Sequence, residues 1–156
     1  FEAARWAASA FNEQPWNYII ARKNDGPEYE KALSCLVEPN QAWAKDAPVL
    51  LLAVARLTYT HNDKPNSTAL HDLGLASANL TLEATARGLA VHQMGGILPD
   101  RARDLYQVPE GYQVVAALAL GYPGEGEGPL AERDAKARSR KPQSEFVFDG
   151  VFGRPF

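Results

Sequence analysis

The sequence contains little of what several common classes of protein require. Its 156 residues include a single cysteine, Cys35, so an intrachain disulfide and a cysteine-rich zinc site are excluded. The 16 lysines and arginines are balanced by 19 aspartates and glutamates, and the net charge is −3, which gives no basic excess to attract nucleic acid. No apolar run is long enough to cross a membrane. These features favour a protein of the reducing cytoplasm that acts neither on nucleic acid nor at a membrane.

Patterns that carry familiar catalytic or nucleotide-binding chemistry are also missing. There is no Ser–His–Asp pattern and no evident carboxylate pair, so we predict no catalytic side chain. The histidine–aspartate pairs at 61–63 and 71–72 lack metal-site spacing, so we predict no metal. The glycine-rich stretch 121–129 is interrupted by Pro123 and Pro129 and opens no helix, which excludes a dinucleotide-binding fingerprint.

The segments that are present predict one domain, spanning residues 1–156. At 46% hydrophobic and 22% charged residues, the chain is long enough to enclose a substantial core. The apolar runs 49–55 and 113–120 are typical of strands covered on both faces. Because residues 1–8 favour helix but lack an N-cap, we expect an upstream segment to precede them. Further strands are predicted at 17–21 and 145–148, and helices at 28–36, at 39–47, at 69–89 and at 99–106.

The longest predicted helix, residues 69–89, is almost entirely apolar. On a helical wheel at about 100° per residue, its polar residues Asp72, Asn79, Glu83 and Arg87 fall within a wedge of roughly 80°. Such a helix is either the central helix of the domain or has one face covered by a second subunit. Glu83 and Arg87, four residues apart, are expected to pair.

A turn near the start of the chain, residues 8–16, concentrates polar groups on a stiff backbone. Ser9, Asn12 and Gln14 can all form hydrogen bonds, and Pro15 fixes its own φ and disfavours helix at Gln14. Such a turn offers the polar groups that a planar heteroaromatic ligand needs. On spacing alone, a structural polar cluster explains the turn equally well.

Three other segments carry candidate functional residues. The Gly95–Gly96 pair permits close backbone approach to a ligand, although a plain turn also explains it. Arg138 and Arg140 alternate in the basic segment 133–141, as suits a phosphate, although a solvated charged segment is the alternative. The polar stretch 56–68 is predicted to be a loop over a site. His92 is predicted to be a structural hydrogen-bonding residue.

Five segments, in this order, resemble the FMN-dependent nitroreductase family. They are SAFNEQPW at 9–16, PNQAW at 39–43, GG at 95–96, LGYP at 120–123 and RSRKP at 138–142. The resemblance covers nearly the whole chain. It implies an α+β fold with a central antiparallel or mixed β-sheet flanked by helices, including a long buried central helix. It also implies a homodimer with FMN at each subunit interface.

The resemblance further implies which residues bind FMN and what the protein does. The turn residues would lie along the flavin ring, the glycine backbone near its N5 and O4 side, and the arginines at its phosphate. The implied activity transfers hydride or electrons from NAD(P)H, through FMN, to nitroaromatic, quinone or similar acceptors. The alternatives are a flavin-binding protein without physiological turnover and related flavin chemistry such as reductive dehalogenation. The implied FMN-binding residues are Ser9, Asn12, Gln14, Asn40, Gln93, Met94, Gly95, Gly96, Arg138 and Arg140.

The sequence also departs from the family pattern in two ways. The Arg-rich, Ser-containing segment with which the family usually opens is absent from these residues, and Ala8 stands where a proline is common. If an upstream segment supplies these groups, the implied FMN contacts are unaffected, whereas without such a segment the expected affinity for FMN would fall.

Overall fold

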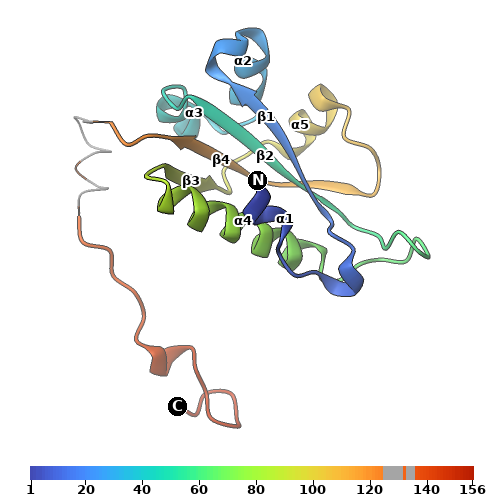
Figure 1. Ribbon diagram of the computed structural model, residues 1–156, viewed down its shortest axis with the longest axis vertical. Helices are drawn as coiled ribbons and strands as arrows, with labels where there is room; N and C mark the ends of the chain where they lie inside the picture. The colour runs from blue at the N-terminus through green and yellow to red at the C-terminus, as the bar shows by residue number, and fades with distance from the viewer. Residues whose placement is uncertain (125–131, 133–135) are drawn as a thin grey trace. The chain divides into compact units, whose positions relative to one another are not determined.

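The computed structural model describes residues 1–124, 132 and 136–156 (Figure 1). Its chain divides into two compact units, Phe1–Pro123 and Gly124–Phe156, which are described separately. Most of the predicted glycine-rich loop 121–129 and the start of the basic segment lie outside the described residues. The prediction of a single domain over 1–156 stays a prediction.

The first unit is built on a four-stranded sheet with strand order β1-β2-β4-β3, in which every neighbouring pair is antiparallel. Trp16 pairs with Ala55, and Met94 pairs with Ala117. The two edges of the sheet are therefore β1 and β3. The strands are β1 (Trp16–Arg22), β2 (Val49–Arg56), β3 (Ala90–Met94) and β4 (Tyr112–Gly121).

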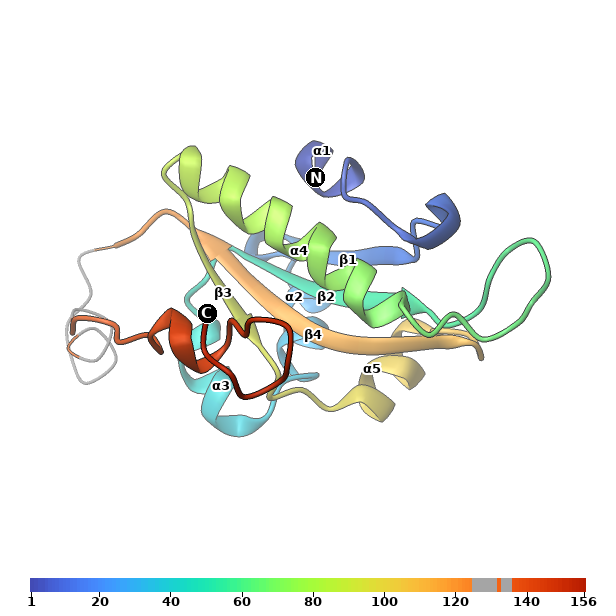
Figure 2. The same cartoon turned by 90° about the horizontal axis from the view of Figure 1, so that it is seen from below.

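Helices cover both faces of this sheet, which confirms the predicted α+β class. Figure 2 shows α1 and α4 on one face and α2, α3 and α5 on the other. The helices are α1 (Glu2–Arg5), α2 (Pro27–Leu33), α3 (Glu38–Ala44), α4 (Ala69–Ala86) and α5 (Pro99–Tyr106).

Successive side chains of β2 point to opposite faces of the sheet, so this strand contributes to the apolar clusters on both faces. Leu50 and Leu52 belong to the apolar cluster beneath α2, α3 and α5, whereas Leu51 and Ala53 belong to the cluster beneath α4. Full burial of each leucine contributes about 1.5–3 kcal/mol. This burial confirms that the apolar run 49–55 is a strand covered on both faces.

Helix α4 is buried on one side only. Gly88, at φ +79°, follows its C-cap Arg87, and the predicted Glu83–Arg87 pair forms at 2.6 Å. Leu82 is 70% exposed although it is apolar, whereas Asp72, from the predicted polar wedge, is only 3% exposed. The first unit therefore does not enclose this helix, so the predicted long buried helix has an apolar side that this unit leaves uncovered.

The strand predicted at 145–148 is wrong. In the second unit a short 3-10 helix, η3 (Gln143–Glu145), occupies part of that stretch, and Phe148 forms only an isolated bridge with Pro155. Gly150 and Gly153 have φ of +73° and +89°, respectively. They turn the chain back after a few residues, so no continuous strand pairing develops.

Candidate functional site

The turn before β1 has an unusual backbone. It contains η1 (Ala10–Asn12), and Phe11, Asn12 and Gln14 have φ of 52°, 57° and 48°. Non-glycine residues rarely adopt this left-handed region, and such strain concentrates at functional sites. The Gln14 backbone N–H donates to Ser9 Oγ at 3.0 Å, and Gln14 Nε2 donates to the Asn12 carbonyl at 3.0 Å. The turn is therefore held in one shape while the Asn12 and Gln14 side chains stay exposed.

Asp72, at the start of α4, anchors this turn. Its Oδ2 accepts hydrogen bonds from the Ala10 backbone N–H at 3.1 Å and from Thr68 Oγ1 at 3.2 Å. We did not select Asp72 from the sequence, because an acidic residue in the first turn of a helix is ordinary. No pattern in the sequence connects it to a turn 62 residues away.

Asn40 and Gly96 meet at the other edge of the sheet. Asn40 Nδ2 donates to the Gly96 carbonyl at 3.0 Å, and the Val37 backbone N–H donates to the same oxygen at 3.1 Å. A Cβ at Gly96 would lie 2.5 Å from Asn40 Nδ2 and 2.9 Å from Val37 Cγ2, whereas a Cβ at Gly95 would meet nothing within 4 Å. Packing within the chain thus explains Gly96, while Gly95 leaves space for a ligand beside exposed backbone.

The residues before the glycine pair have different surroundings. Gln93 is exposed, and its Nε2 donates to Thr81 Oγ1 at 2.9 Å. Met94 is buried in the core beneath α2, α3 and α5. His92 packs edge-on against Trp43, with ring centroids 4.7 Å apart. A hydrogen-bonding role for His92 stays a prediction.

One chain does not bring its two groups of candidate residues together. The turn 9–14 leads into β1 and the glycine pair follows β3, so they lie at opposite edges of the sheet, as Figures 1 and 2 show. Three strand spacings of about 4.8 Å separate these edges by about 14 Å. Arg138 and Arg140 belong to the second unit, where both are exposed and Arg140 Nη1 donates to the Ser139 carbonyl at 2.8 Å.

The single cysteine is buried and chemically inert. Cys35 is fully buried, and burial raises the pKa of its thiol. Its Sγ lies 3.3 Å from the Lys31 carbonyl. The thiol is thus protonated near neutral pH and unsuited to nucleophilic attack. In the part of the chain that the structure describes, no three His, Cys, Asp or Glu residues gather as a metal site, and no helix has the length and apolarity to span a membrane.

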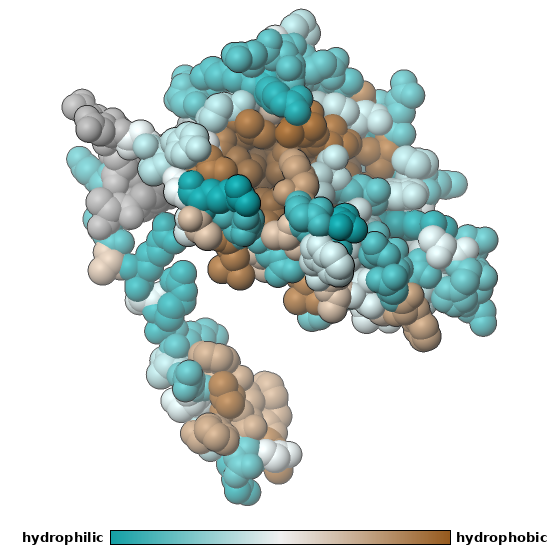
Figure 3. Space-filling view, viewed as in Figure 1, coloured by the Kyte–Doolittle hydropathy of each residue, from teal (hydrophilic) through white to brown (hydrophobic). Residues whose placement is uncertain are grey.

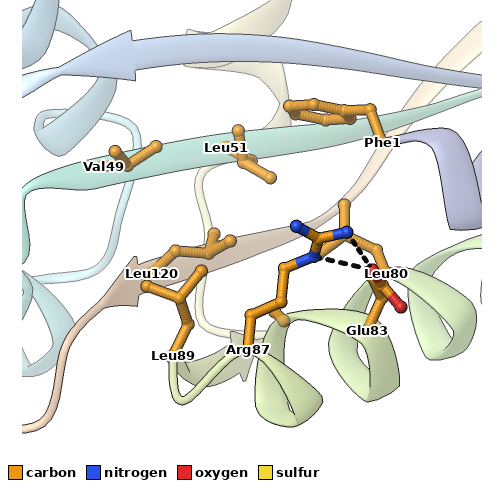
Figure 4. A pocket seen from close by; sticks show the side chains of 9 residues that line it. Phe1, Val49, Leu51, Leu80, Glu83, Arg87, Leu89 and Leu120 are labelled. Atoms are coloured by element: carbon orange, nitrogen blue, oxygen red, sulfur yellow. Dashed lines mark hydrogen bonds and ion pairs between the residues drawn. The ribbon is translucent and has the colours of Figure 1, made fainter.

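An apolar pocket lies apart from the turn and from the glycine pair. Figure 3 shows a hydrophobic hollow near the middle of one face, and Figure 4 shows the pocket itself, between α4 and strands β2 and β4. Its volume is about 220 Å³, and the Glu83–Arg87 pair stands beside it. The pocket has no polar group of the candidate site. The lining residues are Phe1, Val49, Leu51, Leu80, Glu83, Ala84, Arg87, Leu89 and Leu120.

The residues present fit a flavin. A planar ring with polar edges suits exposed amide side chains on a rigid turn, and the open backbone at Gly95 permits close approach of that ring. Both features are at the surface of the first unit, so a ligand reaches them without rearrangement of the core.

Comparison with known proteins identifies relatives of this chain. A solved structure described as the oxidoreductase containing FMN is 35% identical, with a TM-score of 0.89 over 98% of this chain and 79% of that chain. An uncharacterized 15.4 kDa protein of Mycolicibacterium smegmatis is 32% identical over 79% of this chain and 84% of its own length.

Another relative carries a name that states an activity. A Methanothermobacter thermautotrophicus protein named "Putative NADH dehydrogenase/NAD(P)H nitroreductase" is 32% identical over 81% of this chain and 65% of its own length. The family model described as "Nitroreductase family" matches residues 1–122, which is most of the chain. The chain therefore belongs to the nitroreductase family of oxidoreductases.

Proposed function

We propose that this protein is an FMN-dependent NAD(P)H oxidoreductase that reduces nitroaromatic compounds, quinones or similar acceptors. The observation that carries the proposal is the turn 9–14, where three non-glycine residues are held in left-handed conformation at the surface. Family membership supplies the cofactor class, and the 35% identical FMN-containing oxidoreductase supports it. Strain of this kind costs about 1–3 kcal/mol per residue and persists where function requires it.

The proposed roles of the residues are to bind and orient. When bound, FMN would supply the hydride and electron transfer that side chains cannot. Ser9 and Asp72 hold the shape of the turn, while the exposed Asn12 amide and the Gln14 Oε1 would hydrogen-bond the polar edge of the ring. At the glycine pair, Gly95 would let the flavin ring approach the backbone closely. The residues around it are Asn40, Gln93, Met94 and Gly96. Arg138 and Arg140 would bind the phosphate.

A homodimer is part of the proposal. The two groups of candidate residues lie at opposite edges of one sheet, so a second copy is needed to bring one chain's turn to the other's glycine pair. The apolar side of α4 that the first unit leaves uncovered supplies a surface for that copy. The flavin would then lie at the subunit interface.

An absorption spectrum of the purified protein tests the function directly. We expect a flavin spectrum that bleaches when NADH or NADPH is added under nitrogen and returns with a quinone or nitroaromatic acceptor. Flavin that neither nicotinamide bleaches would favour the alternative, a flavin-binding protein without turnover. A colourless protein that cannot be reconstituted with FMN would refute both.

A further inference from the structure

The Glu13 carboxylate joins the turn to a distant hairpin. Residues 57–66, here called the hairpin, follow β2 and lie in the stretch predicted to be a loop over a site. Glu13 Oε2 accepts from the Thr60 backbone N–H at 2.9 Å, and Oε1 accepts from Thr60 Oγ1 at 3.0 Å. His61 Nδ1 lies 3.1 Å from the same Oε1. One carboxylate thus makes three polar contacts with two consecutive hairpin residues.

The burial of the Glu13 side chain and the direction of its pKa shift both agree with a stable contact to the hairpin. The Glu13 side chain is only 4% exposed, although it belongs to a surface turn. The Thr60 backbone N–H, together with the side chains of His61 and Thr60, lowers the pKa of Glu13 despite the opposing effect of burial. Glu13 is therefore ionised near neutral pH, and its hydrogen bonds are charge-assisted, the stronger class of hydrogen bond.

Aromatic rings form a second contact between the turn and the hairpin. Phe11 packs edge-on against Tyr59, with centroids 5.6 Å apart, and lies 5.9 Å from His61. Phe11 is nevertheless 81% exposed and has φ of 52°. Burial does not explain an exposed phenylalanine in strained backbone, whereas its contacts with the Tyr59 and His61 rings do join it to the hairpin.

The hairpin has its own internal order and a further ion pair with β2, in which Asp63 Oδ1 lies 3.6 Å from Arg56 Nη2. Thr58 bridges to Pro65, and the Tyr59 backbone N–H donates to the Lys64 carbonyl at 2.9 Å. At its base, the Leu57 backbone N–H donates to the Gly111 carbonyl at 2.7 Å. The tip around Thr60 is exposed and projects away from the sheet in Figures 1 and 2. Glu13 is thus the ionised group that ties this tip to the turn.

We propose that Glu13 is a positioning residue that holds the hairpin against the flavin-facing turn, so that the hairpin forms a fixed side of the acceptor entrance. This inference rests on the proposed function, because the turn is assigned to the flavin there. A fixed hairpin limits which acceptors reach the ring. Its release broadens the entrance and alters the selection of acceptors by ring size.

Hydrogen exchange at the hairpin tests the structural half of the proposal without any flavin. In Glu13→Ala, we expect the Thr60 amide to exchange at least about tenfold faster, because it loses a charge-assisted acceptor. Glu13→Gln, which keeps one acceptor oxygen, should give a smaller increase. The control is Glu30→Gln on the exposed surface of α2, which should leave Thr60 unchanged. Equal Thr60 exchange in the parent and both Glu13 variants overturns the proposal.

Steady-state kinetics with one-ring and two-ring quinones test the functional half. We expect Glu13→Ala to change the ratio of the two KM values by about threefold or more, since the hairpin borders the entrance. Faster exchange with an unchanged ratio would show that the hairpin does not border the entrance, and would overturn the proposal. A protein that takes up no FMN refutes the proposed function, while the exchange result still decides whether Glu13 holds the hairpin.

Discussion

At the scale of single residues, Asp72 has the most consequential contacts that the sequence did not reveal. It is nearly fully buried and satisfies the Ala10 N–H inside the strained turn. A buried donor that loses its acceptor costs about 1–3 kcal/mol. The hydrogen bond from the Ala10 N–H to Asp72 therefore helps to maintain the shape of the turn, on which the proposed flavin contacts depend.

Replacement of Asp72 by alanine should loosen the turn. We expect Asp72→Ala to lower the free energy of unfolding by about 1–3 kcal/mol and to reduce the FMN retained on purification. Urea unfolding and the flavin-to-protein absorbance ratio measure the two effects. Asp104→Ala, at an exposed position on α5, is the matched control and should change neither. Full flavin retention in Asp72→Ala would show that the turn keeps its shape without this contact.

Tyr29 links α2 to the segment after α3 and should make stability depend on alkaline pH. Its hydroxyl donates to the carbonyls of Ala44, at 2.8 Å, and Ala47. Burial, followed by the nearby charges of Glu30 and Asp46, raises the pKa of Tyr29 to about 12 from its ordinary value of 10.0. Because the folded pKa is the higher one, this contribution is complete below pH 10 and declines as the pH rises towards 12.

The Tyr29→Phe variant isolates this contribution. We expect the free energy of unfolding to fall by about 0.5–1.5 kcal/mol at neutral pH, because the hydrogen bonds are lost. The difference from the parent should shrink as the pH rises above about 10, where the unfolded parent ionises. Urea unfolding at several pH values measures both effects, with Tyr122→Phe at an exposed site as control. A difference that grows with pH would contradict the assigned direction of the pKa shift.

At the scale of elements, the sequence predicted those helices and strands whose ends or burial depend on neighbouring residues. Helix α5 runs over Pro99–Tyr106 as predicted, because Pro99 at its first turn and the turn after Tyr106 set its ends. The apolar runs became β2 and β4 because two layers of helices cover them. The stretch 145–148 has a strand-like composition, but the chain around it offers no continuous partner for pairing.

The candidate site was predictable as segments but not as a set of contacts. The turn, the glycine pair and the Asn40 connector all stand out in the sequence because of their composition. Asp72 and Glu13 do not, since the groups that they contact lie 62 and 47 residues away, respectively. Such contacts follow from the packing of α4 and the path of the hairpin, which composition alone does not specify. The assignment of residues to FMN stays a prediction.

The two adjacent glycines should respond differently to the same substitution. A Cβ at Gly96 would overlap Asn40 Nδ2 and Val37 Cγ2, so Gly96→Ala should destabilise the protein by about 1–3 kcal/mol. Gly95→Ala meets nothing in the chain and should leave the free energy of unfolding nearly unchanged. If the flavin approaches Gly95, the latter variant should still lose FMN affinity. Thermal unfolding and FMN titration of the two variants separate structure from binding.

At the scale of the whole molecule, α4 contributes an apolar surface that the rest of the first unit leaves uncovered. Its exposed side includes Gly74, Leu75, Ala78 and Leu82, which recur at helical spacing and combine small residues with leucines. In the proposed homodimer a second copy of the same helix would pack on this surface, because small residues let two helices approach closely. That homodimer is also proposed to bring the turn of one chain to the glycine pair of the other.

The oligomeric state therefore decides whether the site is complete. We expect the protein to sediment at micromolar concentration with twice the 17.0 kDa mass of one chain. Leu82→Glu places a charge on the exposed side of α4 and should yield monomers that retain little FMN, because each site would lose residues of the other chain. Leu105→Glu, an exposed leucine on α5 across the sheet, should remain dimeric and yellow. A monomeric parent that binds FMN would instead require one chain to hold the flavin alone, which the separation of the turn from the glycine pair opposes.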